Sequence, residues 1–245
     1  MRLRSLIGTA LVSCVCLTAS SALGAPRQRT QPARPAARPA LKYVFTNQRL
    51  QAVNRRTGKV RWTFGHGLGP LTVWDSKTIY TFSADGKMFG INRWTGRLLW
   101  SATLKLDLKS GDYLIHGLEL SRGTLFVSHS HGVIAYYCPT GQEQWRITEG
   151  HGEYHWINPG ASFLADSAVL ICYSASGAYT HDVTKAFDRR TGRLLWERNA
   201  MVTQVKGDRV SLHSLYPSDP PREWSGVVDA RTGKVLTETG GSQGG

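Results

Sequence analysis

The chain has 245 residues, enough for one domain of moderate size or two small ones, and 41% of them are hydrophobic. Its 30 Lys and Arg against 17 Asp and Glu give a formal net charge of +13, which favours anionic partners such as acidic polymers or lipid head groups. Nucleic acid is disfavoured as a partner, because the sequence contains no basic helix and no recognisable nucleic-acid-binding module.

The N-terminus has the pattern of an export signal. The basic residues Arg2 and Arg4 precede an apolar stretch at 6–17, and small residues follow it. We therefore predict a signal peptide over residues 1–24 and export to the periplasm, the cell envelope or the extracellular medium. A lipobox-like sequence ending at Cys14 is the alternative and would create a lipid anchor. The apolar stretch continues past Cys14, however, which favours simple cleavage.

Residues 25–40 contain four prolines, four arginines and no large apolar side chain. Such a segment cannot offset the entropy lost on ordering, so we expect a disordered, basic spacer. The glycine-rich residues 240–245 are expected to form a flexible tail. The predicted folded domain covers residues 41–239, and without the arginines of the signal and the spacer it keeps 24 Lys and Arg against 17 Asp and Glu, near +7.

A Thr-Gly pair recurs five times within this domain, beginning at residues 57, 95, 140, 191 and 232. The spacings of 38 to 51 residues, with short β-prone runs before and after each pair, are typical of propeller blades with about four strands each. The fold class predicted is therefore all-β, a β-propeller of about five blades. The first blade should have three strands, because only the spacer lies upstream of it, and the total should be 19 strands.

The residues around each Thr-Gly pair predict a hairpin turn between the third and fourth strands of a blade. In four of the five registers an Asn or Asp stands three residues before the Thr, where its side chain can accept hydrogen bonds from backbone amides ahead of it. The glycine can take a positive φ, as a hairpin loop that ends in a bulge requires. These glycines are Gly58, Gly96, Gly141, Gly192 and Gly233.

A tryptophan stands four residues after the glycine in each of the first four registers, at Trp62, Trp100, Trp145 and Trp196, and Thr237 replaces it in the last. Such rings can cover a flat cofactor, but a ring repeated once per blade is more simply explained by packing between blades. We therefore expect these tryptophans to be structural.

The pattern Ala-x-Asp-x-x-Thr-Gly-x-x-x-Trp resembles the pyrroloquinoline-quinone (PQQ)-type propeller repeat, and the resemblance covers nearly all of residues 41–238. This repeat occurs in quinoprotein dehydrogenases and in the outer-membrane assembly lipoprotein of the BamB type. The resemblance implies PQQ-type blades. For the dehydrogenases it also implies eight blades, a catalytic Asp and a calcium shell around the quinone.

The differences between this sequence and the dehydrogenase pattern favour the hypothesis of a non-catalytic protein. The chain has five registers, and Asp188 and Asp229 are already assigned to turns. We predict no catalytic residue and no cofactor, and PQQ with calcium is disfavoured. Instead, we predict a scaffold that binds a protein or an anionic envelope component. The alternative is a degenerate quinoprotein oxidoreductase or a metal-assisted hydrolase. No metal site is predicted, because the two histidines of 151–155 have a helical spacing in a segment that reads as a loop.

Two cysteines, Cys138 and Cys172, remain after the signal. In an oxidising compartment these two cysteines could form a disulfide, but they fall in different repeats. The alternative hypothesis is two buried free thiols.

Strand direction predicts which side of the propeller binds a partner. All five Thr-Gly turns should lie on one side, where their arginines would make weak, salt-sensitive contacts with anions. The longer loops should lie on the opposite side, and we expect docking there, around blades three and four. The residues predicted to take part are His129, His131, His151, Tyr154, His155, Trp156, Tyr179 and His181.

Overall fold

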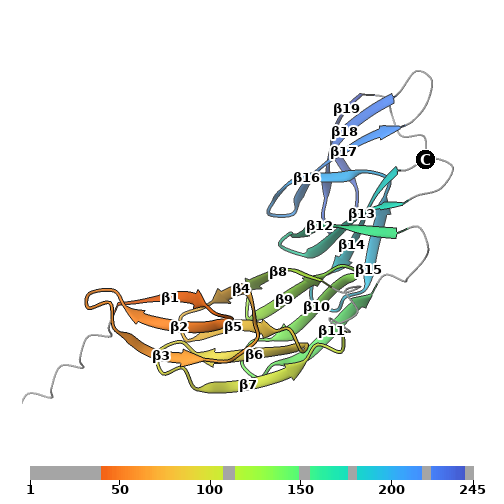
Figure 1. The fold of residues 1–245 in the computed structure, drawn as a ribbon. Coiled ribbons are helices and arrows are strands. Elements are labelled where there is room, and N and C mark those ends of the chain that lie inside the picture. The colour runs from red at the N-terminus through yellow and green to blue at the C-terminus, as the bar shows by residue number, and fades with distance from the viewer. Residues whose placement is uncertain (1–39, 107–113, 149–154, 176–180, 217–221, 241–245) are drawn as a thin grey trace, which may run out of the picture. The chain divides into compact units, whose positions relative to one another are not determined.

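The structure is a computed structural model, and it describes residues 40–106, 114–148, 155–175, 181–216 and 222–240. Within these ranges the chain forms 19 β-strands in five antiparallel sheets, one with three strands and four with four (Figure 1). The predicted β-propeller of about five blades with a three-stranded first blade is confirmed. The predicted signal peptide, almost all of the spacer, and Cys14 lie outside the described residues.

Each sheet consists of strands that are consecutive in the chain. The first sheet contains β1 (Leu41–Thr46), β2 (Arg49–Asn54) and β3 (Val60–Phe64). The second contains β4 (Leu68–Trp74), β5 (Thr78–Ser83), β6 (Lys87–Asn92) and β7 (Leu98–Thr103). The third contains β8 (Ile115–Ser121), β9 (Thr124–His129), β10 (Gly132–Tyr137) and β11 (Gln142–Thr148).

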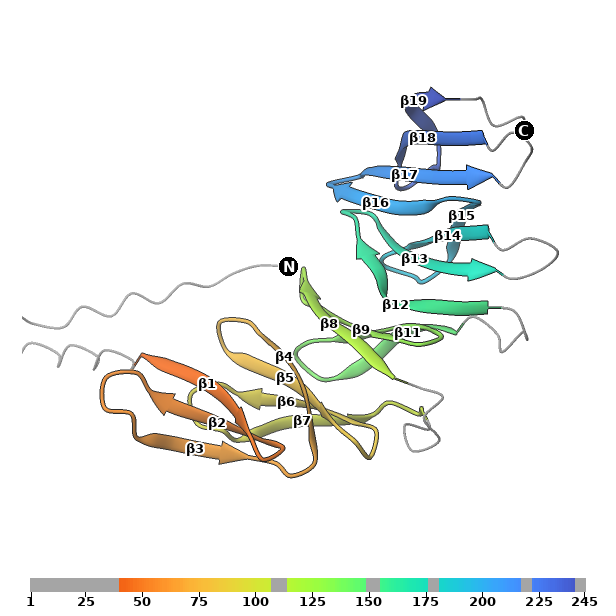
Figure 2. The same ribbon diagram turned by 45° about the horizontal axis from the view of Figure 1, so that its top comes forward.

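The fourth sheet contains β12 (His155–Leu164), β13 (Ala168–Ala175), β14 (His181–Asp188) and β15 (Leu194–Arg198). The fifth contains β16 (Met201–Lys206), β17 (Arg209–Tyr216), β18 (Arg222–Asp229) and β19 (Val235–Gly240), which follow one another as neighbours in Figure 2. In the part of the chain described, no helix has the length and apolar character needed to cross a membrane.

The five Thr-Gly turns have one backbone conformation. Their glycines have φ between 68° and 71°, the left-handed region that the predicted hairpin loop requires. Next to each turn the pairing of the two flanking strands shifts register at a bulge, as where Gly90 of β6 pairs with Trp100 but Ile91 pairs with Leu98. In the first turn the Asn54 side-chain oxygen accepts hydrogen bonds from the amides of Arg56 and Thr57, at 2.8 and 3.1 Å. The same two bonds recur in the second, fourth and fifth turns.

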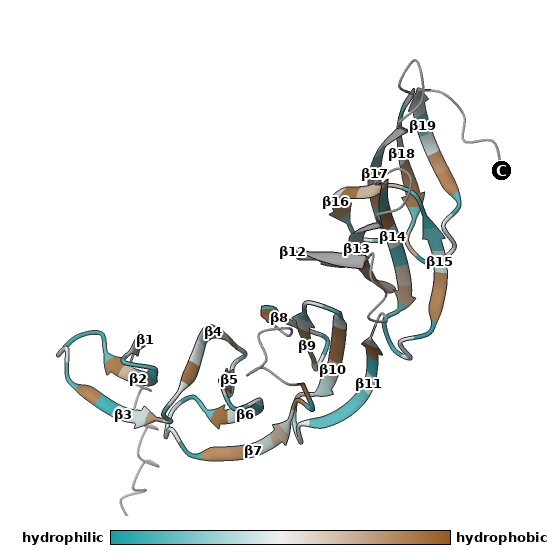
Figure 3. Ribbon diagram, turned by 45° about the vertical axis from the view of Figure 1, so that its right-hand side comes forward, coloured by the Kyte–Doolittle hydropathy of each residue, from teal (hydrophilic) through white to brown (hydrophobic). Residues whose placement is uncertain are grey.

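Successive sheets pack face to face through separate apolar clusters. Leu50 and Ile79 belong to the cluster between the first and second sheets, and Leu125 lies in the cluster between the second and third. Val169 and Leu170 belong to the clusters that join the fourth sheet to the third and to the fifth. Figure 3 shows the hydrophobic residues concentrated along the strands and the hydrophilic ones at the turns. Each fully buried Leu or Ile contributes about 1.5–3 kcal/mol to these interfaces.

The closing contact expected between the first and fifth blades has no such cluster among the described residues, and it stays a prediction. Cys138 and Cys172 are both free and buried, in the third and fourth sheets, which agrees with the reading as two thiols. Burial raises the pKa of both thiols.

Candidate functional site

Each repeated tryptophan reaches the Thr-Gly turn of the following sheet. Its indole nitrogen donates a hydrogen bond to the carbonyl of the residue that follows the Asn or Asp position of that turn. The acceptors are Arg93 for Trp62 (3.3 Å), Cys138 for Trp100 (2.8 Å), Arg189 for Trp145 (3.2 Å) and Ala230 for Trp196 (2.8 Å).

The same indole ring covers the glycine of the turn. A Cβ atom added to Gly192 would lie 2.9 Å from the Trp145 ring, and one added to Gly233 would lie 2.8 Å from the Trp196 ring. We call this paired contact, hydrogen bond and covered glycine, the indole junction. Four indole junctions join the five sheets, so the tryptophans lie between blades.

In the four-stranded sheets, the turns between the first and second strands lie on the same side as the Thr-Gly turns, because the strands are antiparallel and consecutive. We call this the Thr-Gly side. A hollow of about 510 Å³ lies on it, over the third, fourth and fifth sheets. Its lining consists of four arginines, two aspartates and four other polar residues: Arg122, Arg189, Arg190, Arg231, Asp166, Asp188, Ser121, Thr124, Gln144 and Ser167.

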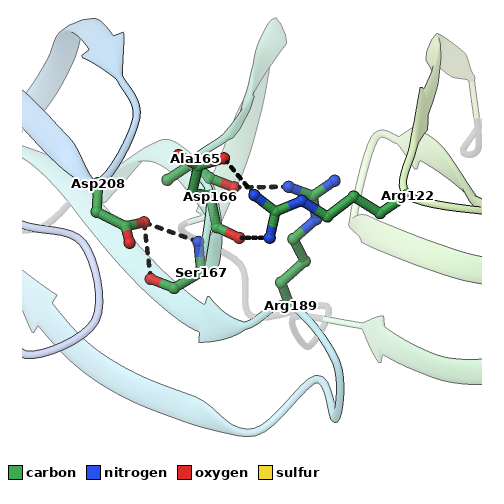
Figure 4. A network of polar contacts seen from close by, with 6 residues as sticks. All are labelled: Arg122, Ala165, Asp166, Ser167, Arg189 and Asp208. Carbon is green, nitrogen blue, oxygen red and sulfur yellow. Dashed lines mark hydrogen bonds and ion pairs between the residues drawn. The ribbon is translucent and has the colours of Figure 1, made fainter.

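Polar contacts run across three sheets at this hollow, through the turn that joins β12 to β13 (Figure 4). From the third sheet, Arg122 donates to the Asp166 carboxylate at 2.8 Å and to its carbonyl at 3.3 Å. From the fifth sheet, the Asp208 carboxylate accepts hydrogen bonds from the Ser167 amide and hydroxyl, at 2.7 and 2.8 Å. The ion pair is exposed and contributes little stability by itself, but it fixes where the Arg122 guanidinium lies.

Arg189 lies deeper than the other arginines of the hollow. Its Nη1 donates to the Ala165 carbonyl at 2.9 Å, and its guanidinium stacks 5.2 Å from the centre of the Phe126 ring. Its Nη2 is buried and has no hydrogen-bond partner within the described structure. Burial, and then repulsion by Arg122, lower the pKa of Arg189. The carboxylates of Glu119, Asp166 and Asp208 offset part of this lowering, and an anion at the hollow would offset it further.

Asp188 is committed to its turn. Its Oδ1 accepts from the amides of Arg190 and Thr191 and from the Thr191 hydroxyl, the last at 2.8 Å. The Thr191 hydroxyl bond and the two amide bonds hold the pKa of the Asp188 carboxyl below its ordinary value. Asp188 is therefore charged at neutral pH, while Arg190 and Arg231 extend into solvent beside it.

The described residues contain no group of three or more His, Cys, Asp or Glu side chains placed to hold a metal ion. Chemically, this region can recognise anions: guanidinium groups form paired hydrogen bonds with carboxylates and phosphates.

Only some of the residues predicted to bind a partner on the opposite side lie within the described ranges. His129 is almost entirely buried, and burial lowers its pKa to about 3, so it is neutral and does not reach the surface. His131 follows it, half-buried, in the turn between β9 and β10. His155 and Trp156 lie in β12 and His181 in β14. His151, Tyr154 and Tyr179 lie outside the described residues, and docking on that side stays a prediction.

Sequence reasoning placed arginines on the Thr-Gly side but missed Arg122 and Asp166. Both stand in turns between the first and second strands, and these turns share no sequence motif across the five sheets. A charged residue next to Gly or Ser between two β-prone runs was the available signal. Their pairing was hidden because they lie 44 residues apart.

The model of the family described as outer membrane protein assembly factor BamB matches residues 46–240. The chain belongs to this family. The five Thr-Gly registers lie within the matched range, which covers every described strand except β1.

One curated relative of this BamB-family chain is a longer protein, an enzyme. The chain is 24% identical to tetrathionate hydrolase of Acidithiobacillus ferrooxidans over 76% of its own length and 40% of the length of that enzyme. The chain thus spans well under half of this curated relative.

Two solved dehydrogenase structures support the fold at low sequence identity. A quinohemoprotein alcohol dehydrogenase from Pseudomonas putida superposes with a TM-score of 0.52 and 19% identity, covering 82% of this chain and 40% of that one. The quinohemoprotein alcohol dehydrogenase of Comamonas testosteroni superposes with a TM-score of 0.50 and 14% identity, covering 83% of this chain and 42% of that one. BamB from Moraxella catarrhalis has a TM-score of 0.41 and 15% identity, covering 83% of this chain and 73% of that one. At these identities the dehydrogenase structures support the fold alone.

Proposed function

We propose that the chain is an exported, non-catalytic β-propeller that acts as a binding scaffold for a protein or an anionic component of the cell envelope. The observation that carries this proposal is the arginine-lined hollow on the Thr-Gly side, on a chain whose family is named for outer membrane protein assembly. A rigid array of sheets that presents polar turns is suited to recognition.

The described residues do not fit a bound quinone with calcium. In this structure the four repeated tryptophans, which could cover a flat ring system, lie against neighbouring turns. Calcium requires several oxygen ligands, and the acidic residues of the hollow are engaged by Arg122 and by turn amides. The proposal therefore includes no resident cofactor.

Titration with PQQ, with and without calcium, separates the scaffold from its main alternative. Tryptophan fluorescence should show no saturable quenching, because the indoles are covered by adjacent turns. Tight, saturable quenching that requires calcium would overturn the proposal in favour of a quinoprotein. A pull-down from envelope extract, with the heat-unfolded protein as control, should recover a partner through the folded chain.

A second candidate is a degenerate oxidoreductase or hydrolase, favoured by the similarity to tetrathionate hydrolase and to alcohol dehydrogenases. Assays for tetrathionate hydrolysis and for quinone-dependent alcohol oxidation test it directly. We expect no turnover above that of the heat-unfolded protein.

Export is tested separately by sequencing the N-terminus of the protein recovered from the cell envelope. We expect it to begin near residue 25. A chain that begins at an acylated Cys14 would support the lipid anchor instead.

A further inference from the structure

The hollow on the Thr-Gly side gathers more cations than carboxylates. Its four arginines come from three successive sheets: Arg122 from the third, Arg189 and Arg190 from the fourth, and Arg231 from the fifth. The two aspartates of its lining leave an excess of two positive charges. Such an excess in one concave place raises the local concentration of anions.

The two carboxylates are already occupied by contacts inside the protein. Asp166 pairs with Arg122, and Asp188 accepts three hydrogen bonds within its own turn. Arg190 contributes its backbone amide to one of these bonds, but the guanidinium groups of Arg190 and Arg231 donate none of them and are exposed. These two guanidinium groups are therefore available to an external anion.

The deeper part of the hollow strengthens this preference. Arg189 is half-buried, close to the like charge of Arg122, and one of its nitrogens has no partner. A positive charge that is partly removed from water acts on a nearby anion through a lower effective dielectric constant than a charge at the surface does.

The size and the lining of the hollow favour a peptide over a single ion. Its volume of about 510 Å³ suits a ligand with several groups. Ser121, Thr124 and Gln144 stand between the arginines and can exchange hydrogen bonds with peptide groups. Arginines that come from three sheets match carboxylates spaced along a chain. A lipid surface, in contrast, presents its charges on a plane and fits a concave site less well.

We propose that this hollow binds an acidic peptide segment of a protein partner, whose carboxylates pair with Arg190 and Arg231. The inference rests on the proposed scaffold function and names the class of partner for its site.

Binding is measured with fluorescein-labelled hexaglutamate by fluorescence anisotropy, using the full chain. The test variant is Arg190→Gln with Arg231→Gln, which removes two exposed charges and leaves the turn bonds of Asp188 and Asp229 in place. The matched control is Arg55→Gln with Arg56→Gln, which removes the same charge from the equivalent turn of the first sheet, outside the hollow. Melting temperatures establish that both variants are folded.

We expect hexaglutamate to bind the wild-type chain, with weaker binding at high salt. The test variant should bind about tenfold more weakly, because it loses two charge-assisted contacts, and the control should change by less than about twofold. Equal weakening in both variants, or no binding to the wild type, would overturn the proposal.

Two competitors distinguish the other sources of negative charge. Inorganic phosphate at equal ionic strength should not displace the peptide, and phosphatidylglycerol vesicles should not bind in a manner that depends on Arg190 and Arg231. Displacement by phosphate would reduce the hollow to a simple anion site, and vesicle binding would assign it to lipid; either result contradicts the proposal. Failure of hexaglutamate alone leaves the scaffold function standing, whereas saturable PQQ binding overturns that function without affecting this measurement.

Discussion

The tetrapeptide Arg-Arg-Thr-Gly occurs twice, at 55–58 and at 189–192, in turns with nearly the same backbone but different neighbours. In the first copy Arg55 is exposed, and none of the described residues comes within 4 Å of a Cβ placed on Gly58. In the second copy Arg189 bonds to Ala165 and stacks on Phe126, and the Trp145 ring covers Gly192. The local sequence thus determines the conformation of the turn, whereas the contacts of its side chains depend on the residues packed against it.

The largest expected difference in stability comes from the Trp145 ring, which contacts the second copy, whereas no such ring covers Gly58 of the first copy among the described residues. Trp145→Ala should lower the free energy of unfolding by about 3–5 kcal/mol, because it empties a buried site and leaves the Arg189 carbonyl without its indole donor. Urea unfolding measures this change. A decrease below about 1 kcal/mol would contradict a structural role for the indole junction.

Substitution of the two glycines tests the same contact from the other side. Gly58→Ala adds only the strain of a positive φ, about 1 kcal/mol, whereas Gly192→Ala adds a clash with the Trp145 ring and should cost about 2–4 kcal/mol. In a Trp145→Ala background the cost of Gly192→Ala should fall to that of Gly58→Ala. Equal costs in the wild-type background would show that the ring moves away freely.

Substitution of the first arginine should also destabilise the second copy more than the first, but by a smaller free energy than the changes above. Arg189→Ala should cost about 1–3 kcal/mol, because it leaves the Ala165 carbonyl unpaired and removes the stacking on Phe126. Arg55→Ala should change the unfolding free energy by less than about 0.5 kcal/mol. Thermal unfolding of the two variants side by side measures the contrast, and equal losses would refute it.

The smallest effect is a pH dependence that only the second copy has, since Asp188 there replaces Asn54. The pKa of Asp188 is lower in the folded chain than its ordinary value. Asp188 therefore stabilises the fold above the ordinary Asp pKa of about 3.9, and this contribution is lost as the pH falls through the folded pKa.

Asp188→Asn should therefore lower the melting temperature at neutral pH, and the difference from the wild type should shrink below about pH 4. Asn54→Asp is the matched control and should introduce the same acid dependence into the first copy. A difference that stays constant across the pH range would assign the effect of Asp188→Asn to shape rather than charge.

The turns could be predicted from the sequence because their determinants are local. Asn54 acts on amides two and three residues ahead, and Gly58 supplies its own positive φ. The blade count followed from the repetition of such turns, and the three-stranded first sheet followed from the proline-rich spacer upstream of it.

The hollow could not be predicted, because its residues meet only when sheets pack. Arg122 and Asp166 belong to different sheets, and neither stands in a repeated position. The burial of His129 was also missed, since its position in a short polar segment, 128–132, reads as an exposed loop. Local rules give turns and strands, whereas the neighbours of a side chain depend on the packing of whole sheets.

The indole junction has a direction, since each sheet gives a tryptophan to the next and covers its glycine. At the two ends of the array this exchange stops. The first sheet has an uncovered Gly58, and the fifth register has Thr237 where the tryptophan would stand. A contact repeated head to tail between copies of a chain extends into a filament unless one end lacks its half of the contact. Because Thr237 stands where the tryptophan would be, the fifth sheet has no indole at this position to offer to the turn of a further sheet, whether in this chain or in another copy.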